Sequence, residues 1–388
     1  MIDKSSFLLV SIILIISGCG RTKVKTSIND GKGKDRSVTE LKAIKEKMFE
    51  LDSLTAPNPE SICYTQLDSN HKNYISFLNG STGAIYFYND DTKGFEFKIQ
   101  TTRDGPSGVG KISGHYIHNM DSIFVLDSWS SKLSIINSKG HLINSFSLAP
   151  KTFKENVYLP NPYLSSFRPA YVLNNKIFLL GKTLGEFEDE NAENRPVLII
   201  YDLTKRIIEY DISYPEIYQQ ANWGAMNYRD VFGAVNQAKS TLVISFPADH
   251  NLYFYNLISR KLESKYAGSN MMGDIQSLDK PKDFKDITII YKHFGTNPSY
   301  SSIIFNPYKN EYYRIADHPL PAYDENMKEK SVKQFSVILL DSNFNKLGET
   351  IIPHLSHSRL SFYTSPAGLN IRKYTNDENH LTFTIYSH

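Results

Sequence analysis

A repeated pattern of short strands and tight polar turns runs through the chain from about residue 62 to residue 388. The clearest copy is DSIFVLDSWSSKLSIINSKGHLINSFSL, residues 121–148, in which apolar and polar residues alternate around Leu133 and Ile135 before a Ser-Lys-Gly turn. Alternation with period two is typical of strands, and a glycine turn between two such runs predicts a hairpin. The sequence therefore predicts a body of consecutive antiparallel hairpins.

Looser copies of this pattern lie on both sides of it, at residues 73–100, 175–213, 240–266, 301–317 continuing to 332–352, and 368–388. Their spacing of roughly 45 to 65 residues is in the range of propeller blades with long hairpin loops. We predict an all-β, six-bladed β-propeller over residues 62–388. Two β-sandwich domains are the alternative, but no linker-like change of composition divides this region.

The last unit, residues 368–388, has only two clear strands, so the sixth blade lacks an outer strand. Residues 37–61 are available to supply it through KMFELDS and so to join the two ends of the ring. Ser37 and Glu40 in the same region fit a capping box followed by apolar residues at helical spacing. We therefore expect a short helix or a closing strand over residues 37–61.

The amino-acid composition agrees with a β-rich body. The chain contains 25 Tyr and 22 Phe, an enrichment that is typical of strands. Its 43 Lys and Arg against 41 Asp and Glu leave a net charge of +2, and no long basic run occurs. The sequence thus has no electrostatic footprint for nucleic acid.

The chain begins with MIDKSSFLLVSIILIISGCG, where a lysine-bearing start precedes an apolar run from Phe7 to Ile16. This order is typical of an export signal. Ten helical residues rise only about 15 Å, roughly half of the hydrocarbon core of a bilayer, so the run is too short to span a membrane. We expect residues 1–18 to be a signal peptide.

Ile16-Ser17-Gly18-Cys19 resembles the lipobox of bacterial lipoproteins, in which the cysteine sulfur is lipidated and the chain is cut just before it. The resemblance implies that Cys19 is the mature, lipidated N-terminus, and several acyl chains then hold the protein on a membrane. An ordinary secretory signal that contains a cysteine is the alternative. Residues 19–36 are polar and contain Gly and Lys, which predicts a flexible tether.

Cys63 is the only other cysteine, so no intramolecular disulfide is expected once Cys19 carries lipid. We expect Cys63 to be a small buried residue. A nucleophilic thiol is the alternative, although no histidine motif accompanies it in the sequence.

Four features occur together in this sequence: the lipobox, GPSGVGKI between the first two units, SFRPAYV near the middle, and YTSPAGLNIRK with ENHLTFTIY at the end. Together they resemble the Bacteroidota lipoproteins grouped as domain-of-unknown-function family 4221, which are similar to six-bladed propellers. The resemblance implies the fold and a cell-envelope address but no activity. The residues after Cys19 lack the early acidic cluster associated with surface export in Bacteroidota, so we expect a periplasm-facing position at the outer membrane.

Gly105-x-x-x-x-Gly110-Lys111 contains most of a phosphate-binding loop signature. Ile112 stands where that loop needs a hydroxyl, and the following residues predict strands rather than a helix. We therefore interpret the segment as a glycine-rich crossing between two blades and expect no nucleotide.

Histidines and acidic residues form small groups that suggest metal sites only weakly. His115 and His118, like His354 and His357, lie in strand or loop contexts, where a separation of three residues places side chains on opposite faces. Acidic pairs at residues 90–91, 189–190 and 377–378 lie in turns without a calcium-loop pattern. We expect no metal and no cofactor.

A series of cationic residues precedes the expected inner strands: Arg103, Arg168, Arg229, His293 and Arg359. Four of them have an aromatic residue close by, namely Phe167, Tyr228, Phe294 or Phe362. These positions lie near one mouth of a propeller channel, so the pattern predicts a ring that binds an anionic ligand. The alternative is that each arginine pairs with a nearby acid, such as Asp104 or Asp230, and ties blades together.

Trp223 lies in the same class of loop as Arg229 and is also a candidate, either to stack on a sugar or to anchor a partner. Core packing is its alternative.

Three functions remain open from the sequence. The first is a lipid-anchored propeller that binds a partner protein, a peptide or an anionic glycan-derived ligand at its channel face. The second is a metal-dependent, lactonase-like hydrolase or lyase, and the third is a structural component of an envelope complex. Converging carboxylates and amides in the channel would favour the enzyme, arginines the anion binder, and an apolar plug the scaffold. We favour binding, because no catalytic constellation is present in the sequence.

Overall fold

The computed structural model describes residues 24–31, 38–59, 61–67, 72–149, 158–183, 195–224, 226–278, 286–322 and 332–388. The predicted signal peptide, residues 1–18, and Cys19 lie outside these residues. The described chain consists mostly of strands and turns, and none of its helices is both long and apolar enough to pass through a bilayer.

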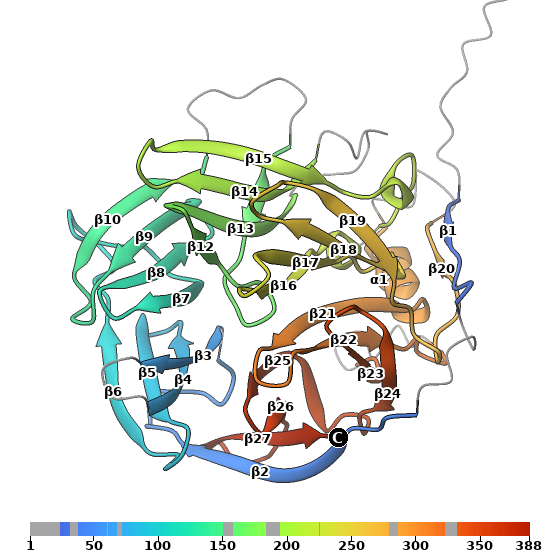
Figure 1. Ribbon diagram of the computed structural model, residues 1–388. Coiled ribbons are helices and arrows are strands. Elements are labelled where there is room, and N and C mark those ends of the chain that lie inside the picture. Colours follow the sequence, from blue (N-terminus) through green and yellow to red (C-terminus); the bar gives the residue numbers. More distant parts are fainter. Residues whose placement is uncertain are drawn as a thin grey trace, which may run out of the picture.

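Six antiparallel sheets surround a central channel as the blades of a propeller, which confirms the predicted fold (Figure 1). The first strand of each blade lies at the channel, and later strands lie progressively outward. Blade 1 contains β3 (Ile62–Leu67), β4 (Lys72–Asn79), β5 (Ala84–Asn89) and β6 (Phe95–Gln100). Blade 2 contains β7 (Gly114–Asn119), β8 (Ser122–Asp127), β9 (Lys132–Ile136) and β10 (Leu142–Ser147).

Blade 3 differs from the others in having two short strands, β11 (Pro160–Pro162) and β12 (Tyr171–Leu173), that both pair with β13 (Lys176–Thr183). Its outer strands are β14 (Pro196–Asp202) and β15 (Ile207–Ser213). Two 3₁₀ turns, η2 (Glu216–Tyr218) and η3 (Met226–Arg229), lead to blade 4.

Blades 4 and 5 are regular four-stranded sheets joined by a longer connection. Blade 4 contains β16 (Phe232–Asn236), β17 (Thr241–Ser245), β18 (Asn251–Asn256) and β19 (Leu262–Tyr266). The connection carries β20 (Ile275–Gln276) and the helix α1 (Ile287–Thr296). Blade 5 contains β21 (Ser299–Asn306), β22 (Glu311–Asp317), β23 (Phe335–Leu340) and β24 (Lys346–Ile351).

Blade 6 is built from both ends of the chain. It contains β25 (His357–Ser365), β26 (Gly368–Lys373) and β27 (His380–Ser387), and its outermost strand is β2 (Lys42–Glu50), which pairs antiparallel with β27. Of the two alternatives for residues 37–61, the structure therefore shows the closing strand. Closure of the ring in this way covers a sheet edge that would otherwise be exposed.

Apolar side chains between neighbouring blades form the core. Ile85 and Phe87 of blade 1 belong to one buried cluster with Ile123 and Val125 of blade 2, and similar clusters fill the other blade junctions. Burial of this apolar surface is the main source of stability in such a fold. The aromatic enrichment of the sequence is thus used largely between blades.

Residues 24–31, within the segment predicted to be a tether, lie on the propeller. They include β1 (Thr26–Ser27), which pairs antiparallel with β20. Further along, the N–H of Thr39 donates to the carbonyl of Leu347 in β24. Residues 24–31 thus lie beside the connection after blade 4, and Thr39 lies beside the outer strand of blade 5, just before the chain enters blade 6 as β2.

The glycine-rich segment RDGPSGVGKISG is the crossing from β6 to β7, as we interpreted it. Gly105 and Gly110 have φ angles of 87° and 82°, which favour glycine, and the N–H of Gly110 donates to the carbonyl of Arg103. Val109 and Ile112 are buried between blades 1 and 2. The position at which a phosphate-binding loop needs a hydroxyl therefore holds a core residue.

Candidate functional site

The approach to the inner strand of blade 3 forms a hairpin that enters the channel. Residues 163–170, called the channel hairpin below, turn at Ser166 and Phe167, and the backbone N–H groups of Ser165 and Arg168 each donate to the carbonyl of the other. Figure 1 shows this loop reaching from blade 3 into the centre of the ring. The short turn thus carries two side chains into the channel.

The tip of the channel hairpin contacts two other blades. The Ser166 hydroxyl donates to the carbonyl of Phe362 in β25, and the N–H of Gly233 in β16 donates to the carbonyl of Phe167. The Phe167 ring packs against Phe232 and Phe362, with ring centroids 5.9 and 5.7 Å away. Phe232, Gly233 and Phe362 come just before the residues of β16 and β25 that line the cavity described next. The hairpin therefore fills the channel on the side where the inner strands begin.

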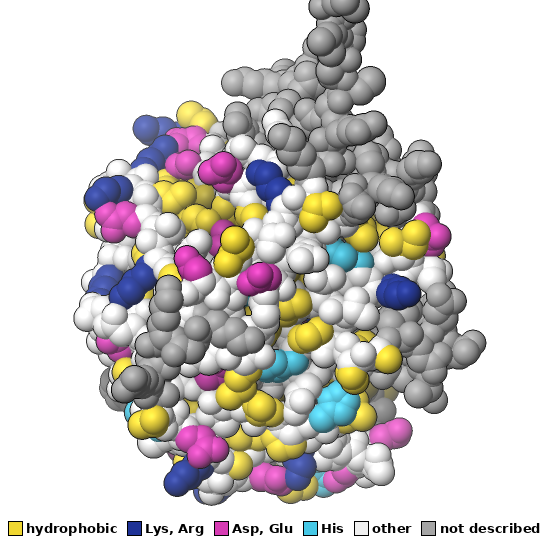
Figure 2. Space-filling model, turned by 90° about the vertical axis from the view of Figure 1, so that its right-hand side faces the viewer, with side chains coloured by type: hydrophobic (Ala, Val, Ile, Leu, Met, Phe, Trp, Pro, Cys, Tyr) yellow, Lys and Arg dark blue, Asp and Glu magenta, His cyan; other side chains and the backbone are white. Residues whose placement is uncertain are grey.

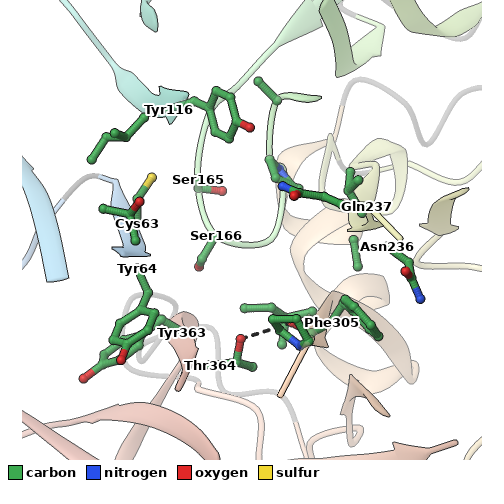
Figure 3. Close-up of a pocket in the computed structure, with 18 of the residues that line it drawn as sticks. Cys63, Tyr64, Tyr116, Ser165, Ser166, Asn236, Gln237, Phe305, Tyr363 and Thr364 are labelled. Carbon is green, nitrogen blue, oxygen red and sulfur yellow. Dashed lines mark hydrogen bonds between the residues drawn. The ribbon is translucent and has the colours of Figure 1, made fainter. Parts of the chain in front are cut away.

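A cavity of about 770 Å³ occupies the channel on the other side of the hairpin (Figure 3). It is bounded by β3, β7, the channel hairpin, β16, β21 and β25, and by the turns that follow β16 and β21. Every blade therefore contributes to one pocket, which we call the channel pocket. The hairpin is its floor.

Three tyrosines form an aromatic wall of the channel pocket. The rings of Tyr64 and Tyr363 are stacked, with centroids 5.4 Å apart, and Tyr308 meets Tyr64 edge-on at 6.4 Å. Behind them the Tyr64 hydroxyl donates to Asp90, 3.3 Å away, and Asp90 is in turn paired with Lys47 at 2.6 Å. The buried ion pair of Lys47 and Asp90 therefore fixes the Tyr64 ring through the hydrogen bond to its hydroxyl.

Several uncharged polar groups face the channel pocket without a partner. Among the described residues, neither the Tyr116 hydroxyl nor the Gln237 amide has a hydrogen-bond partner, and the buried Ser165 hydroxyl has none either. Burial raises the pKa of Tyr116, so its hydroxyl stays protonated and can donate as well as accept. Figure 3 shows Tyr116, Gln237 and Ser165 around the same space.

Cys63 and His115 lie next to each other in the pocket wall, but they are not poised for catalysis. The Cys63 thiol donates to the backbone carbonyl of His115 at 3.2 Å, and burial raises its pKa to about 12. The His115 ring contacts the Ser76 hydroxyl at 2.8 Å, and burial lowers its pKa to about 3. The thiol is thus protonated and bound to the backbone of His115 rather than to its ring, and Cys63 is half-buried rather than fully buried as expected.

The wall of the channel pocket carries little charge. Of the described residues that line it, Lys239 is the only Lys, Arg, Asp or Glu, and its ammonium group donates to the backbone carbonyl of Ser342 in blade 5. The pocket therefore presents aromatic rings, hydroxyls and amides rather than a field of one sign.

Arg168, a predicted ligand-binding residue, is part of the channel hairpin but points away from the pocket. Its guanidinium lies 2.9 Å from Asp230, its Nε donates to the carbonyl of Val231 at 2.8 Å, and it stacks over the Phe232 ring at 4.8 Å. Only 11% of the side chain is exposed. This is the pairing that we gave as the structural alternative, and it fastens the hairpin to blade 4.

Tyr228, His293 and Arg359 are brought together around Phe294, where Tyr228 and His293 are buried and the Arg359 side chain is 26% exposed. The Tyr228 ring contacts both His293 and Phe294, and Arg359 lies 6.0 Å over the Phe294 ring. Arg359 also pairs with the buried Asp317 at 2.5 Å. His293 lies on α1 and contacts the carbonyl of Gln276 in β20 at 2.7 Å, so this histidine ties α1 to that strand.

The remaining predicted residues lie apart from these. Trp223 is 1% exposed, and its indole N–H donates to the carbonyl of Ile217, which matches the core-packing alternative. Arg229 is half-buried, and Arg103 is exposed in the crossing from β6 to β7. None of the seven predicted ligand-binding residues lines the channel pocket.

The pocket residues were not among those predicted, because the predicted site rested on charged side chains. Ser166 begins the SFRPAYV segment that marked a resemblance and Ser165 precedes it, yet nothing local shows that this segment enters the channel. Tyr64 and Tyr116 occupy corresponding positions in the inner strands of blades 1 and 2. Aromatic residues recurring at one inner-strand position are the signal that could have found them.

Metal-binding residues do not gather in the described part of the chain. His115 is fully buried and His118 is exposed, so the two lie on opposite faces, as their spacing predicts. No three His, Cys, Asp or Glu side chains in the described residues are arranged to hold a metal ion.

Comparisons with known proteins identify a family and a fold. The family model described as "Domain of unknown function (DUF4221)" matches residues 39–351. A crystal structure of a DUF4221 member from Bacteroides vulgatus has a TM-score of 0.77 and 24% identity, and the match covers 90% of this chain and 98% of that one. A protein from Bacteroides fragilis, whose name marks it as a candidate exported protein, has a TM-score of 0.54 at 10% identity and covers 90% and 95%. No curated protein sequence matches the chain.

Proposed function

The chain belongs to the DUF4221 family, and from its channel pocket we propose that it is a non-enzymatic binding protein of the cell envelope whose ligand is a short, uncharged glycan fragment. The observation that carries this proposal is a channel closed at one side by the channel hairpin and lined by aromatic rings with unpartnered hydroxyl and amide groups.

The size of the channel pocket fits a small ligand. Pockets for small molecules typically enclose about 300 to 1,000 Å³, and this one encloses about 770 Å³. A folded partner protein does not enter such a space, although it can cover the mouth. A ligand of a few sugar rings fills the pocket and leaves most of its surface buried.

The chemistry of the wall suits a sugar. Pyranose rings have apolar C–H faces that pack on aromatic rings such as those of Tyr64 and Tyr308, and hydroxyls at their edges that pair with groups such as the Tyr116 hydroxyl and the Gln237 amide. Hydroxyls and amides both donate and accept, which matches the dual character of sugar hydroxyls. The unpartnered polar groups gain hydrogen bonds when such a ligand binds.

The wall favours a neutral ligand over an anionic one. The predicted arginines do not line the pocket, and the one lysine there, Lys239, lies at the rim with its ammonium group bound to blade 5. A carboxylate or sulfate group in the pocket would therefore lack an arginine partner. The described wall also contains no Asp or Glu that would activate a water.

Titration calorimetry with the mature chain tests this function. We expect neutral oligosaccharides to bind, and acidic oligosaccharides and peptides of similar size to bind at least tenfold more weakly. Tyr116→Phe and Gln237→Ala should each weaken binding about two- to tenfold, because each removes one hydrogen-bonding group. Trp129→Ala is the matched control, since this side chain is 88% exposed, aromatic and outside the pocket.

Three outcomes contradict the proposal. Peptides binding in place of glycans would assign the pocket to a different class of ligand. Tight binding of acidic sugars that is lost in Arg168→Ala would restore the arginine ring. Neutral sugars that bind equally to the parent and to both pocket variants would show that the site lies elsewhere.

We further propose that lipid on Cys19 anchors the protein to the outer membrane, facing the periplasm. The lipobox-like sequence and the candidate exported protein of similar fold support this location. Cys19→Ser should release the protein from the membrane fraction. Protease treatment of intact cells should leave it uncut, and cleavage there would place it on the cell surface instead.

A further inference from the structure

The segment 24–31, called the N-terminal strap below, is bound to the rim of the propeller by its backbone. The N–H of Lys25 donates to the Ser277 hydroxyl, and the N–H of Ser277 donates back to the carbonyl of Lys25, each at 2.9 Å. The carbonyl of Ser27 contacts His250 Nε2 at 3.2 Å. These contacts join the strap to blade 4 and to the connection after it.

Asn29 locks the end of the N-terminal strap. Asn29 is 7% exposed, and its side-chain amide donates to the carbonyls of Ser269 and Met272 at 2.8 and 3.0 Å. Its backbone N–H donates to Asp274 at 2.8 Å, and its side-chain oxygen accepts from the Tyr266 hydroxyl. A polar side chain with all its groups paired in this way specifies one docked position.

The strap leaves little chain between the propeller and Cys19. Val24 is five residues after Cys19, and at about 3.3 to 3.6 Å per residue five residues reach at most roughly 18 Å. Without the strap, the first attachment would be near Thr39, and twenty residues would reach about 70 Å. A lipid on Cys19 therefore lies close to the rim that holds the strap.

The same rim exposes apolar side chains. Val24 is 46% exposed and Ile28 65%, and Met271, beside the loop that binds Asn29, is 42% exposed. Figure 2 shows this side of the molecule, with hydrophobic side chains scattered among charged ones of both signs. Such a surface can approach lipid headgroups without requiring anionic lipids.

We propose that the N-terminal strap turns the rim beside β1 and β20 toward the membrane, so that the propeller stands on its edge. Figure 1 looks along the channel and places β1 and β20 at the outer rim, so the channel axis then runs parallel to the bilayer. The mouth of the channel pocket stays open to the periplasm. This inference rests on the lipid anchor proposed above and does not depend on the ligand.

Energy transfer to labelled lipid tests the orientation. The full-length lipidated protein is placed in vesicles of phosphatidylethanolamine and phosphatidylglycerol with an acceptor dye on a lipid headgroup. A donor dye is attached to Met271→Cys or to Ile143→Cys, both in a Cys63→Ala background. Ile143 lies in β10, the outer strand of blade 2, and is 55% exposed, so it is a matched apolar site across the ring. We expect several-fold greater transfer from position 271.

Variants of the strap separate orientation from anchoring. Asn29→Ala should abolish the difference between the two positions while the protein still floats with the vesicles. Asp30→Ala, an exposed neighbour in the same segment, should preserve it. Equal transfer from both positions in the parent overturns the edge-on orientation alone. A parent protein that fails to float overturns the lipid anchor and this inference together.

Discussion

The hydroxyl of Ser166 in blade 3 donates a hydrogen bond to the backbone carbonyl of Phe362 in blade 6, across the channel. The two residues are 196 positions apart in the sequence. Through this contact a loop of one blade braces the opposite side of the ring and at the same time forms the floor of the channel pocket. The stability of the ring and the shape of the candidate site thus depend on the same residues.

Phe167→Ala should destabilise the fold by about 2 to 4 kcal/mol, because it removes a ring packed against Phe232 and Phe362. Urea unfolding followed by fluorescence measures the change. Trp129→Ala also removes an aromatic ring, but an exposed one, and should change stability by less than about 0.5 kcal/mol. Equal effects of the two variants would contradict the role of the channel hairpin as a brace.

Asp90→Asn should cost about 3 to 5 kcal/mol, because it leaves the buried ammonium group of Lys47 without its charged partner. Lys47 lies in β2, and the same strand carries Glu46, which pairs with Lys373 at the surface. Glu46→Gln should cost no more than about 1 kcal/mol. Thermal or urea unfolding compares the two, and a surface variant as costly as the buried one would refute this ranking.

The fold should lose stability as the pH falls from about 6.5 toward 4. Burial lowers the pKa of His250 and His357 to about 4 and that of His115 to about 3. Between these values and the ordinary pKa near 6.5, the unfolded chain binds protons that the folded chain does not. In this window each such histidine lowers the free energy of unfolding by up to about 1.4 kcal/mol for each unit that the pH falls. Above the window it has no effect on the pH dependence.

Urea unfolding of His115→Gln at a series of pH values checks this dependence. The variant should show a shallower loss of stability between pH 6.5 and 4 than the parent protein. His141→Gln, which changes an exposed histidine, should leave the slope as it is in the parent. Identical slopes for all three proteins would show that buried histidines do not set the acid sensitivity.

Two glycines of the crossing between blades 1 and 2 should respond differently to alanine. Gly105 and Gly110 both have positive φ angles, so each substitution strains the backbone by about 1 kcal/mol. A Cβ at Gly105 meets nothing within 4 Å, whereas one at Gly110 would collide with the Asp127 carboxylate. Gly110→Ala should therefore lower the free energy of unfolding by at least about 1 kcal/mol more than Gly105→Ala does.

The blades could be predicted because the strands of each blade lie next to one another in the sequence. Strands such as β8, β9 and β10 follow one another through short turns, so alternation and turn residues are enough to identify them. The closing strand could also be expected, since the last unit was short of one strand and the region before the first unit offered it. In both cases the sequence pattern itself carries the information.

The candidate site could not be predicted in this way, because it is formed by residues far apart in the chain. The channel hairpin can be identified only from the position of its tip in the folded ring. A contact such as that of Gly233 with Phe167 joins residues far apart in the chain and leaves no pattern in the sequence around either one. The cationic series is visible in the sequence, but a position near an inner strand does not decide whether a side chain faces the channel. Arg168 and Arg359 are instead held by Asp230 and Asp317.

The pairing of β2 with β27 has a consequence for how the chain is assembled. In the sequence β2 precedes the other blade strands and its partner β27 follows them, so a nascent chain cannot complete the ring until β27 has been made. A copy cut short before β27 would keep two unsatisfied strand edges and would be open to aggregation and proteolysis. Completion of the fold therefore depends on the presence of β27, and a chain without it stays open at blade 6.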